Sequence, residues 1–254
     1  AIGYGLNNGL QALIARRAGE NRPEEIGKLF NQGVFIALAI AAIGITLTYL
    51  FVPSIFRYFI HDDLRLQQAI RFLKIRIWGL PFLYIYQMRN ALLVGTNQSK
   101  YLIAGTLAET LCNVFLDYAL IFGKFGFPAI GFNGAAIASI IAEFTGMLVV
   151  YLVIYRKGIS KRFQLFNYFG WDSYNLRLIL RMSSPLIFQH AISIMSWEYF
   201  FLLIDKHGET ALAISNTMRN VFGLFGAVSW ALAATSSAMV SNIIGQNRKE
   251  EVWK

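Results

Sequence analysis

The stretch Gly19-Glu20-Asn21-Arg22-Pro23-Glu24-Glu25-Ile26-Gly27-Lys28 returns near the end of the chain as Gly245-Gln246-Asn247-Arg248-Lys249-Glu250-Glu251-Val252-Trp253-Lys254. Six of the ten positions are identical, and the two copies are 226 residues apart. Each copy follows a long, mostly apolar stretch that contains many small residues. In an apolar chain such self-similarity indicates a duplicated membrane unit.

The composition places the chain in the membrane class. Of its 254 residues 56% are hydrophobic and 15% are charged, and the mean hydropathy is +0.48. A soluble domain of this length needs far more polar surface. The net charge of +9 would suggest nucleic acid in a soluble protein, but here the basic residues form short clusters between apolar runs. That pattern is typical of loops facing anionic lipid, so we expect the lipid bilayer as a partner and no nucleic acid.

The ends and the cysteine content carry less information. The only cysteine, Cys112, excludes an internal disulfide. The chain starts without Met, and no basic region with a cleavage site precedes its first apolar run. We therefore expect interior residues of a longer protein, located in the cell inner (plasma) membrane as a multi-pass chain.

Seven apolar segments are candidates for membrane-spanning helices, the first of them apparently truncated at its N-terminus, so we predict an all-α fold. They cover residues 1–15, 31–59, 69–94, 101–123, 131–155, 178–204 and 210–245. Alternate loops hold fifteen and seven basic residues, which puts the first set in the cytoplasm. The second set includes Arg71 to Arg76, which we interpret as a helix extension whose basic side chains reach water at the outer interface.

Six predicted helices separate the two copies of the repeat. Because six is even, both copies run in the same direction through the membrane, and the repeat is parallel rather than inverted. We predict a first lobe over 1–156, a cytoplasmic connector over 157–177 and the start of a second lobe over 178–254. An intact protein built this way would have twelve helices in about 430 residues.

Residues 89–139 resemble one transporter family. They contain Asn113, Leu116-Asp117-Tyr118, Phe122-Gly123 and Gly131-Phe-Asn-Gly134-Ala-Ala-Ile-Ala138-Ser139. This is similar to the fifth and sixth helices of the multidrug and toxic compound extrusion (MATE) transporters, and the repeated Gly-[Glu/Gln]-Asn-Arg segment also resembles theirs. The resemblance covers essentially the whole chain, as helices two to eight of twelve. It implies a two-lobe helical bundle that exchanges Na⁺ or H⁺ for organic compounds and needs no cofactor.

Three polar residues lie along one face of the helix predicted over 101–123. Glu109, Asn113 and Asp117 are four residues apart, and oxygen ligands in such a strip can hold a proton or a small hard cation. The resemblance implies that Asn113 and Asp117 contribute to the cation site of the first lobe. It also suggests a hydroxyl from the next helix, here Ser139. The alternative is that Asp117 caps or pairs near the end of its helix.

Three further charges fall inside predicted helices and are functional candidates, because charge is costly in a bilayer. Glu143 could join the strip or pair with a neighbouring helix. Glu198 could serve the second lobe, although it lies more than a turn from the place where some relatives have an acid. Arg219 could pair with Glu198 or reach the outer interface. The aromatic residues could line a cavity for flat cations.

The function that these features predict is a secondary antiporter that exports organic compounds or drugs. A flippase for lipid-linked oligosaccharides with the same architecture is an alternative, and a membrane scaffold without transport is another. The sequence contains no enzyme motif, because the three histidines are scattered and no phosphate-binding glycine pattern is present. We expect a monomer when the protein is intact and no resident metal, apart from transient Na⁺ at Asp117 and Asn113.

Overall fold

The structure is a computed structural model that describes residues 2–59, 62–165, 167–168 and 170–252. Within these ranges it is helical and contains no strand, which confirms the all-α prediction. Trp253 and Lys254, the last residues of the second repeat copy, lie outside the described residues. The α-helices are α1 (Ile2–Gly19), α2 (Pro23–Phe59), α3 (Asp63–Arg76), α4 (Leu80–Gly95), α5 (Leu102–Phe122), α6 (Phe132–Arg156), α7 (Ile159–Arg162), α8 (Ser173–Asp205) and α9 (Glu209–Gly245), and the 3₁₀ turns are η1 (Ile77–Gly79), η2 (Ser99–Tyr101) and η3 (Lys249–Glu251).

Local sequence explains several helix boundaries. Asp172 precedes α8, and its carboxylate accepts hydrogen bonds from the backbone N–H groups of Tyr174 and Asn175 at 3.0 and 3.1 Å. Asp62 caps α3 in the same way. Pro23 occupies the first position of α2, where its missing N–H has no helical partner in any case. These residues fix where the long apolar helices begin.

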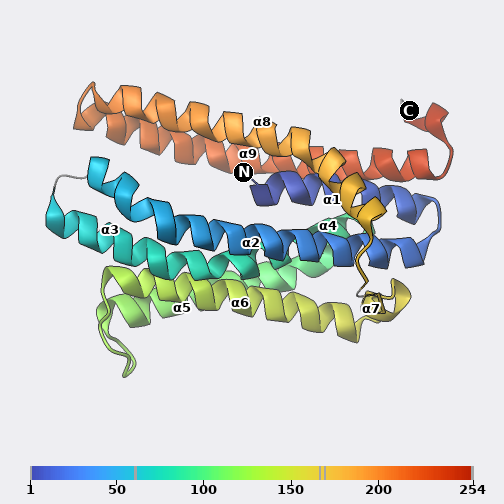
Figure 1. The fold of residues 1–254 in the computed structure, drawn as a ribbon, viewed down its shortest axis with the longest axis horizontal. Coiled ribbons are helices and arrows are strands. Elements are labelled where there is room, and N and C mark those ends of the chain that lie inside the picture. The colour runs from blue at the N-terminus through green and yellow to red at the C-terminus, as the bar shows by residue number, and fades with distance from the viewer. Residues whose placement is uncertain (1, 60–61, 166, 169, 253–254) are drawn as a thin grey trace.

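The helices lie roughly antiparallel in three layers (Figure 1). The α8–α9 hairpin forms one layer, α1 to α4 form the middle, and α5 with α6 forms the third. Helix α1 is enclosed in the centre, since it packs against α2, α4, α8 and α9. Ten of its eighteen residues are buried, and the polar residues Asn7 and Gln11 are among them, so these two side chains face other helices.

Five helices are long and apolar enough to cross a membrane. They run over Pro23–Tyr58, Ser99–Phe122, Phe132–Arg156, Ser173–Asp205 and Glu209–Gly245, and they confirm five of the seven predicted spans. The segment 1–15, of which Ala1 lies outside the described residues, is not among them, because α1 carries Asn7, Asn8 and Gln11. The segment 69–94 is wrong as one uninterrupted helix, because η1 separates α3 from α4 just before Pro81.

The two repeat copies form the same turn. Asn21 and Asn247 both adopt left-handed backbone conformations, with φ of 56° and 63°. The backbone N–H of Arg22 donates to the oxygen of Arg17 at 3.0 Å, and that of Arg248 donates to the equivalent oxygen of Ile243 at 3.2 Å. Asn tolerates this conformation better than most residues, which explains why the repeat keeps it.

These two turns pack directly against each other. A Cβ atom at Gly19 would collide with the backbone oxygen of Asn242, and one at Gly245 would collide with the backbone oxygen of Arg16. Asn242 and Arg16 are themselves 226 residues apart, so the contact is reciprocal. A reciprocal contact is what a two-fold axis produces. Both turns therefore lie at one end of the molecule, as the parallel repeat requires, and we call it the repeat-turn end.

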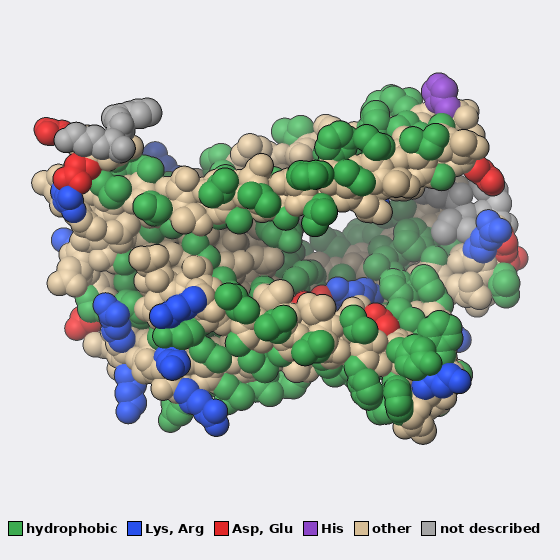
Figure 2. All heavy atoms as spheres, turned by 180° about the vertical axis from the view of Figure 1, so that it is seen from behind, with side chains coloured by type: hydrophobic (Ala, Val, Ile, Leu, Met, Phe, Trp, Pro, Cys, Tyr) green, Lys and Arg blue, Asp and Glu red, His purple; other side chains and the backbone are tan. Residues whose placement is uncertain are grey.

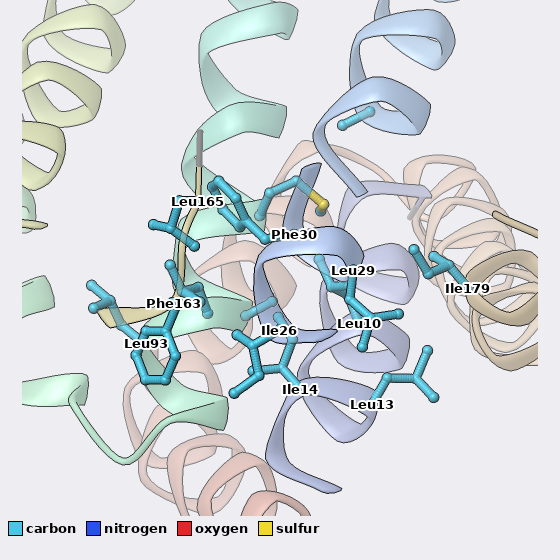
Figure 3. Close-up of a cluster of buried hydrophobic side chains, with 14 of the residues drawn as sticks. Leu10, Leu13, Ile14, Ile26, Leu29, Phe30, Leu93, Phe163, Leu165 and Ile179 are labelled. Atoms are coloured by element: carbon cyan, nitrogen blue, oxygen red, sulfur yellow. The ribbon is translucent and has the colours of Figure 1, made fainter. Parts of the chain in front are cut away.

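The hydrophobic core lies near the repeat-turn end. Leu10 and Ile14 of α1 are fully buried against Ile26 and Leu29 of α2, and Phe163 closes the cluster from the segment after α7 (Figure 3). The turns at Asn21 and Asn97 border a common cavity of about 420 Å³ together with Arg162. The loops that the charge pattern assigns to one side of the membrane are thus neighbours, and Figure 2 shows basic side chains gathered at this end.

The predicted connector, 157–177, is tied to α2. The amides of Asn31 and Gln32 donate to the backbone oxygens of Tyr168 and Gly170 at 2.8 and 2.7 Å. Ile159 and Phe163 are buried. Phe166 and Phe169 lie outside the described residues. The described part of the connector is therefore packed into the protein by hydrogen bonds and apolar burial, more firmly than an interfacial loop would be.

Candidate functional site: a polar strip between α5 and α6

The predicted strip lies on α5, which packs closely on α6. Glycines permit this approach, because a Cβ at Gly134 would come within 2.8 Å of the backbone oxygen of Leu120. One at Gly146 would come within 2.9 Å of the Cβ of Glu109. Small residues at such contacts let two helix backbones come together in a membrane. The strip is consequently held against a rigid neighbour.

The middle of the strip links the two helices. The Asn113 amide donates to the hydroxyl oxygen of Ser139 on α6 at 3.5 Å, and both residues are half-buried. The structure thus brings together two of the predicted cation-binding residues from different helices. An amide oxygen and a hydroxyl oxygen are both suitable ligands for Na⁺, which prefers hard oxygen donors.

Asp117 lies one turn beyond Asn113 and has an unsatisfied carboxylate oxygen. Its Oδ1 is buried and accepts no hydrogen bond from the described residues. The alternative, in which Asp117 caps or pairs near the end of its helix, is not supported, because its side chain forms no hydrogen bond or ion pair with the described residues. Buried polar atoms normally have a partner, and a carboxylate without one can gain the missing interaction from a proton or a cation.

Glu143 is not free to join the strip. It is 8% exposed and pairs with Arg76 of α3, whose Nη1 lies 3.1 Å from Oε2, while the second guanidinium nitrogen contacts Oε1. Buried Gly79 leaves room for this pair, because a Cβ there would collide with both side chains. Arg76, which we expected to reach water with the other basic residues of this segment, is 32% exposed, and its guanidinium is held by a buried carboxylate on α6.

Comparisons with known proteins point to the transporter family that the sequence resembles. Residues 1–119 match the MatE family model. The chain is 25% identical over 250 residues to the multidrug resistance protein MdtK of Photorhabdus laumondii, covering 98% of the chain and 55% of MdtK. A crystal structure of MATE in complex with MaL6 has a TM-score of 0.84 at 19% identity, covering 99% of the chain and 55% of that structure. The chain is therefore similar to MATE transporters over nearly its whole length.

The outward-facing structure of a multidrug resistance MATE family transporter is also similar, with a TM-score of 0.76 at 20% identity over 99% of the chain. The chain spans about half the length of the relatives that it matches. The five candidate spans and these relatives confirm a multi-pass chain of the inner membrane. The predicted resemblance is therefore confirmed.

The two charges predicted for the second lobe are separate from the strip. Glu198 and Arg219 lie on the α8–α9 hairpin, and both are exposed. Among the described ion pairs none joins them. Instead, the Arg219 guanidinium carbon lies 4.9 Å from the centroid of the Phe201 ring. Cation–π contact is the interaction observed for Arg219, so its pairing with Glu198 is not supported.

The positions of two further polar residues, Arg89 and Asn133, were not predicted from the sequence. Arg89, counted with the cytoplasmic loops, is buried within α4 and donates to the backbone oxygen of Met147, while its guanidinium covers the Tyr151 ring at 5.1 Å. Asn133 has a buried, unsatisfied Oδ1 at the start of α6. The position of Arg89 inside an apolar run was a usable signal, whereas only tertiary packing shows that Asn133 is unsatisfied.

Proposed function

We propose that the intact protein is a secondary antiporter that exports small organic compounds, including cationic ones, in exchange for Na⁺ or H⁺. In this proposal residues 1–156 form most of the first lobe, 157–177 form the connector, and 178–254 open the second lobe. The protein works as a monomer. Asp117 holds the coupling ion, with Asn113 and Ser139 beside it and Glu109 two turns away.

The observation that carries the proposal is the buried Oδ1 of Asp117, which has no donor among the described residues. Its neighbours on the strip are oxygen-bearing, and Asn113 reaches Ser139 across the α5–α6 contact. Protonation or Na⁺ binding would satisfy the carboxylate and remove its charge from an apolar region. Occupied and empty states of Asp117 would then differ in how they favour the two arrangements of the lobes.

The contacts of the α8–α9 hairpin support alternating access. Its buried residues are Ile179, Ser183 and Ala238, and all three lie toward the repeat-turn end. Figure 2 shows a hollow between this hairpin and the remaining helices toward the opposite end. With the repeat-turn end in the cytoplasm, this arrangement is open to the outside. Rocking of the lobes that separates the reciprocal contacts of Gly19 with Asn242 and of Gly245 with Arg16 would reverse it.

The test is Asp117→Asn in the intact protein, reconstituted in vesicles with an imposed Na⁺ or H⁺ gradient. The variant keeps the shape of the side chain but cannot bind a proton or neutralise Na⁺. We expect gradient-driven dye efflux to be abolished. Asp205→Asn is the matched control, because Asp205 is exposed at the end of α8, and it should leave efflux intact. Normal efflux by the Asp117 variant would overturn the proposed role.

The flippase alternative expects basic residues along the transport cavity. Arg219 is a basic residue inside a predicted helix and could be such a residue, but its guanidinium lies over the ring of Phe201 on its own hairpin. We therefore do not favour the flippase.

A further inference from the structure

A groove of about 700 Å³ lies between α2 and α3 at the end of the molecule opposite the repeat turns. Tyr49, Pro53 and Arg57 line it from α2 at intervals of four residues, so they share one face of that helix. From α3, Arg71 and Lys74 line the facing wall at an interval of three. The groove is built by two helix faces and not by a loop.

The groove collects positive charge that no carboxylate neutralises. Arg57, Arg71 and Lys74 line it against a single acid, Asp63, and within the described part of the chain none of the three forms an ion pair. The other two basic residues of α3 behave differently, since Arg65 pairs with Asp62 and Arg76 pairs with Glu143. The unpaired bases of this helix are thus the ones that face the groove, which favours an anion as their partner.

The inner wall of the groove is aromatic and fixed. The indole N–H of Trp78 donates to the Tyr49 hydroxyl oxygen at 3.0 Å, and that hydroxyl donates to the backbone oxygen of Lys74 at 3.1 Å. The Lys74 ammonium lies 5.6 Å from the centroid of the Tyr49 ring. Trp and Tyr prefer the boundary between apolar chains and headgroups, so they place the groove at headgroup depth.

The groove also has an apolar lining. Leu66, Ile70 and Ile75 of α3 and Ile140 of α6 border it. A free phosphate ion would gain nothing from contact with these apolar side chains, whereas the acyl chains of a lipid would bury them. The groove therefore combines positive charge, aromatic side chains and an apolar lining, which suit the phosphate, the glycerol region and the acyl chains of a phospholipid.

We propose that this groove binds the phosphate of an anionic phospholipid, with Arg57, Arg71 and Lys74 as its ligands. The inference depends on the α2–α3 packing and not on the transport proposal. Phosphate attracts both arginines as fork-shaped donors and the lysine as a point charge. A bound lipid would brace α2 against α3 at this end of the molecule, where the two helices turn.

The test is native mass spectrometry of the purified chain after exposure to equal amounts of phosphatidylglycerol and phosphatidylcholine. We expect the chain to prefer phosphatidylglycerol, and the variant Arg57→Gln/Arg71→Gln/Lys74→Gln to bind it on the order of a hundredfold more weakly, at about fivefold for each base removed. The single variants Arg57→Gln and Arg71→Gln should each show the fivefold loss, which keeps the test decisive if the triple variant does not fold.

The matched control is Arg65→Gln/Lys124→Gln/Lys206→Gln. These three residues are exposed near the same end and carry the same charge, but they do not line the groove, so binding should change less than about threefold at physiological salt. Equal loss in the control and in the groove variant would overturn the site. Displacement of the lipid by inorganic phosphate, at an ionic strength matched with chloride, would overturn the lipid as its ligand.

Discussion

The ion pair between Arg76 and Glu143 should be the most sensitive polar contact of the first lobe. Glu143 is 8% exposed and Arg76 is 32% exposed, so the pair is buried on one side and reaches water on the other. Removing one partner of a buried pair typically costs 3–5 kcal/mol, because the other charge is left uncompensated. Arg76→Met leaves the buried Glu143 carboxylate without its partner. Because about a third of Arg76 is exposed, we expect a loss of about 2–3 kcal/mol in the free energy of unfolding, which is less than for a fully buried pair.

The reverse substitution should cost less. In Glu143→Gln the remaining arginine can turn its guanidinium toward water, so we expect a loss of about 1–2 kcal/mol. Replacing both partners with apolar residues, Arg76→Met/Glu143→Leu, removes the two charges together and should come within about 1 kcal/mol of the parent. The double variant should therefore be more stable than Arg76→Met alone, which is the signature of a coupled pair.

The assay is unfolding of the purified chain in mixed micelles of mild detergent and dodecyl sulfate, followed by circular dichroism. Arg65→Met is the control on the same helix, because its partner Asp62 is half exposed and Arg65 is 81% exposed. Exposed pairs contribute little, so this variant should unfold almost as the parent does. If Arg76→Met is no more destabilised than Arg65→Met, or if the double variant loses the sum of the single losses, the pair has no structural role.

Two further predictions use the same unfolding measurement. Gly9→Val should lower the free energy of unfolding by about 1–3 kcal/mol, because a Cβ at Gly9 would lie 2.9 Å from the backbone of Ser183 on α8. Gly223→Ala should leave the free energy of unfolding unchanged, because a Cβ there would have nothing within 4 Å. Equal losses for the two variants would refute the α1–α8 contact. Burial alone would raise the pKa of Glu20, but hydrogen bonds and charges from Arg17, Arg16 and Arg22 outweigh burial and lower it. A lowered pKa in the folded state stabilises the protein above the usual carboxyl pKa, and this contribution disappears as the pH falls through the folded pKa. Glu20→Gln should therefore be less stable than the parent at pH 7, and the difference should disappear where the pH is low enough to protonate Glu20 in the folded state. A difference that stays constant across that range would contradict the linkage.

Much of the fold could be predicted from the sequence because the signals are local. Long apolar runs identify helices wherever they pack, and the repeated Asn-Arg segment encodes its turn through Asn21 and Asn247, which adopt the left-handed conformation. The break between α3 and α4 was missed because the run 69–94 stays apolar across it. The low hydropathy of α1 already argued against a membrane-spanning helix in contact with lipid. Asn7, Asn8 and Gln11 are instead suited to a helix that is enclosed by other helices.

The candidate site, too, could be predicted from the sequence only in part. Helical spacing alone predicts that Glu109, Asn113 and Asp117 share a face, because that spacing is a property of one helix. The sequence could not show that Glu143 pairs with Arg76 of α3, since the two residues are 67 positions apart and their meeting depends on how α3 crosses α6. It also could not show that Asn113 reaches Ser139, or that Asp117 keeps one oxygen without a donor.

By itself the sequence determined the helices, the parallel repeat and the family resemblance, because each depends on residue pattern along the chain. Only the tertiary structure decided which charges are neutralised. Arg76 and Arg71 are five residues apart on one basic helix, yet Arg76 meets a buried carboxylate whereas Arg71 faces an open groove. The difference arises because neighbouring faces of α3 meet different partners, and the strength of a charge's interactions depends on burial and on the distance to the opposite charge.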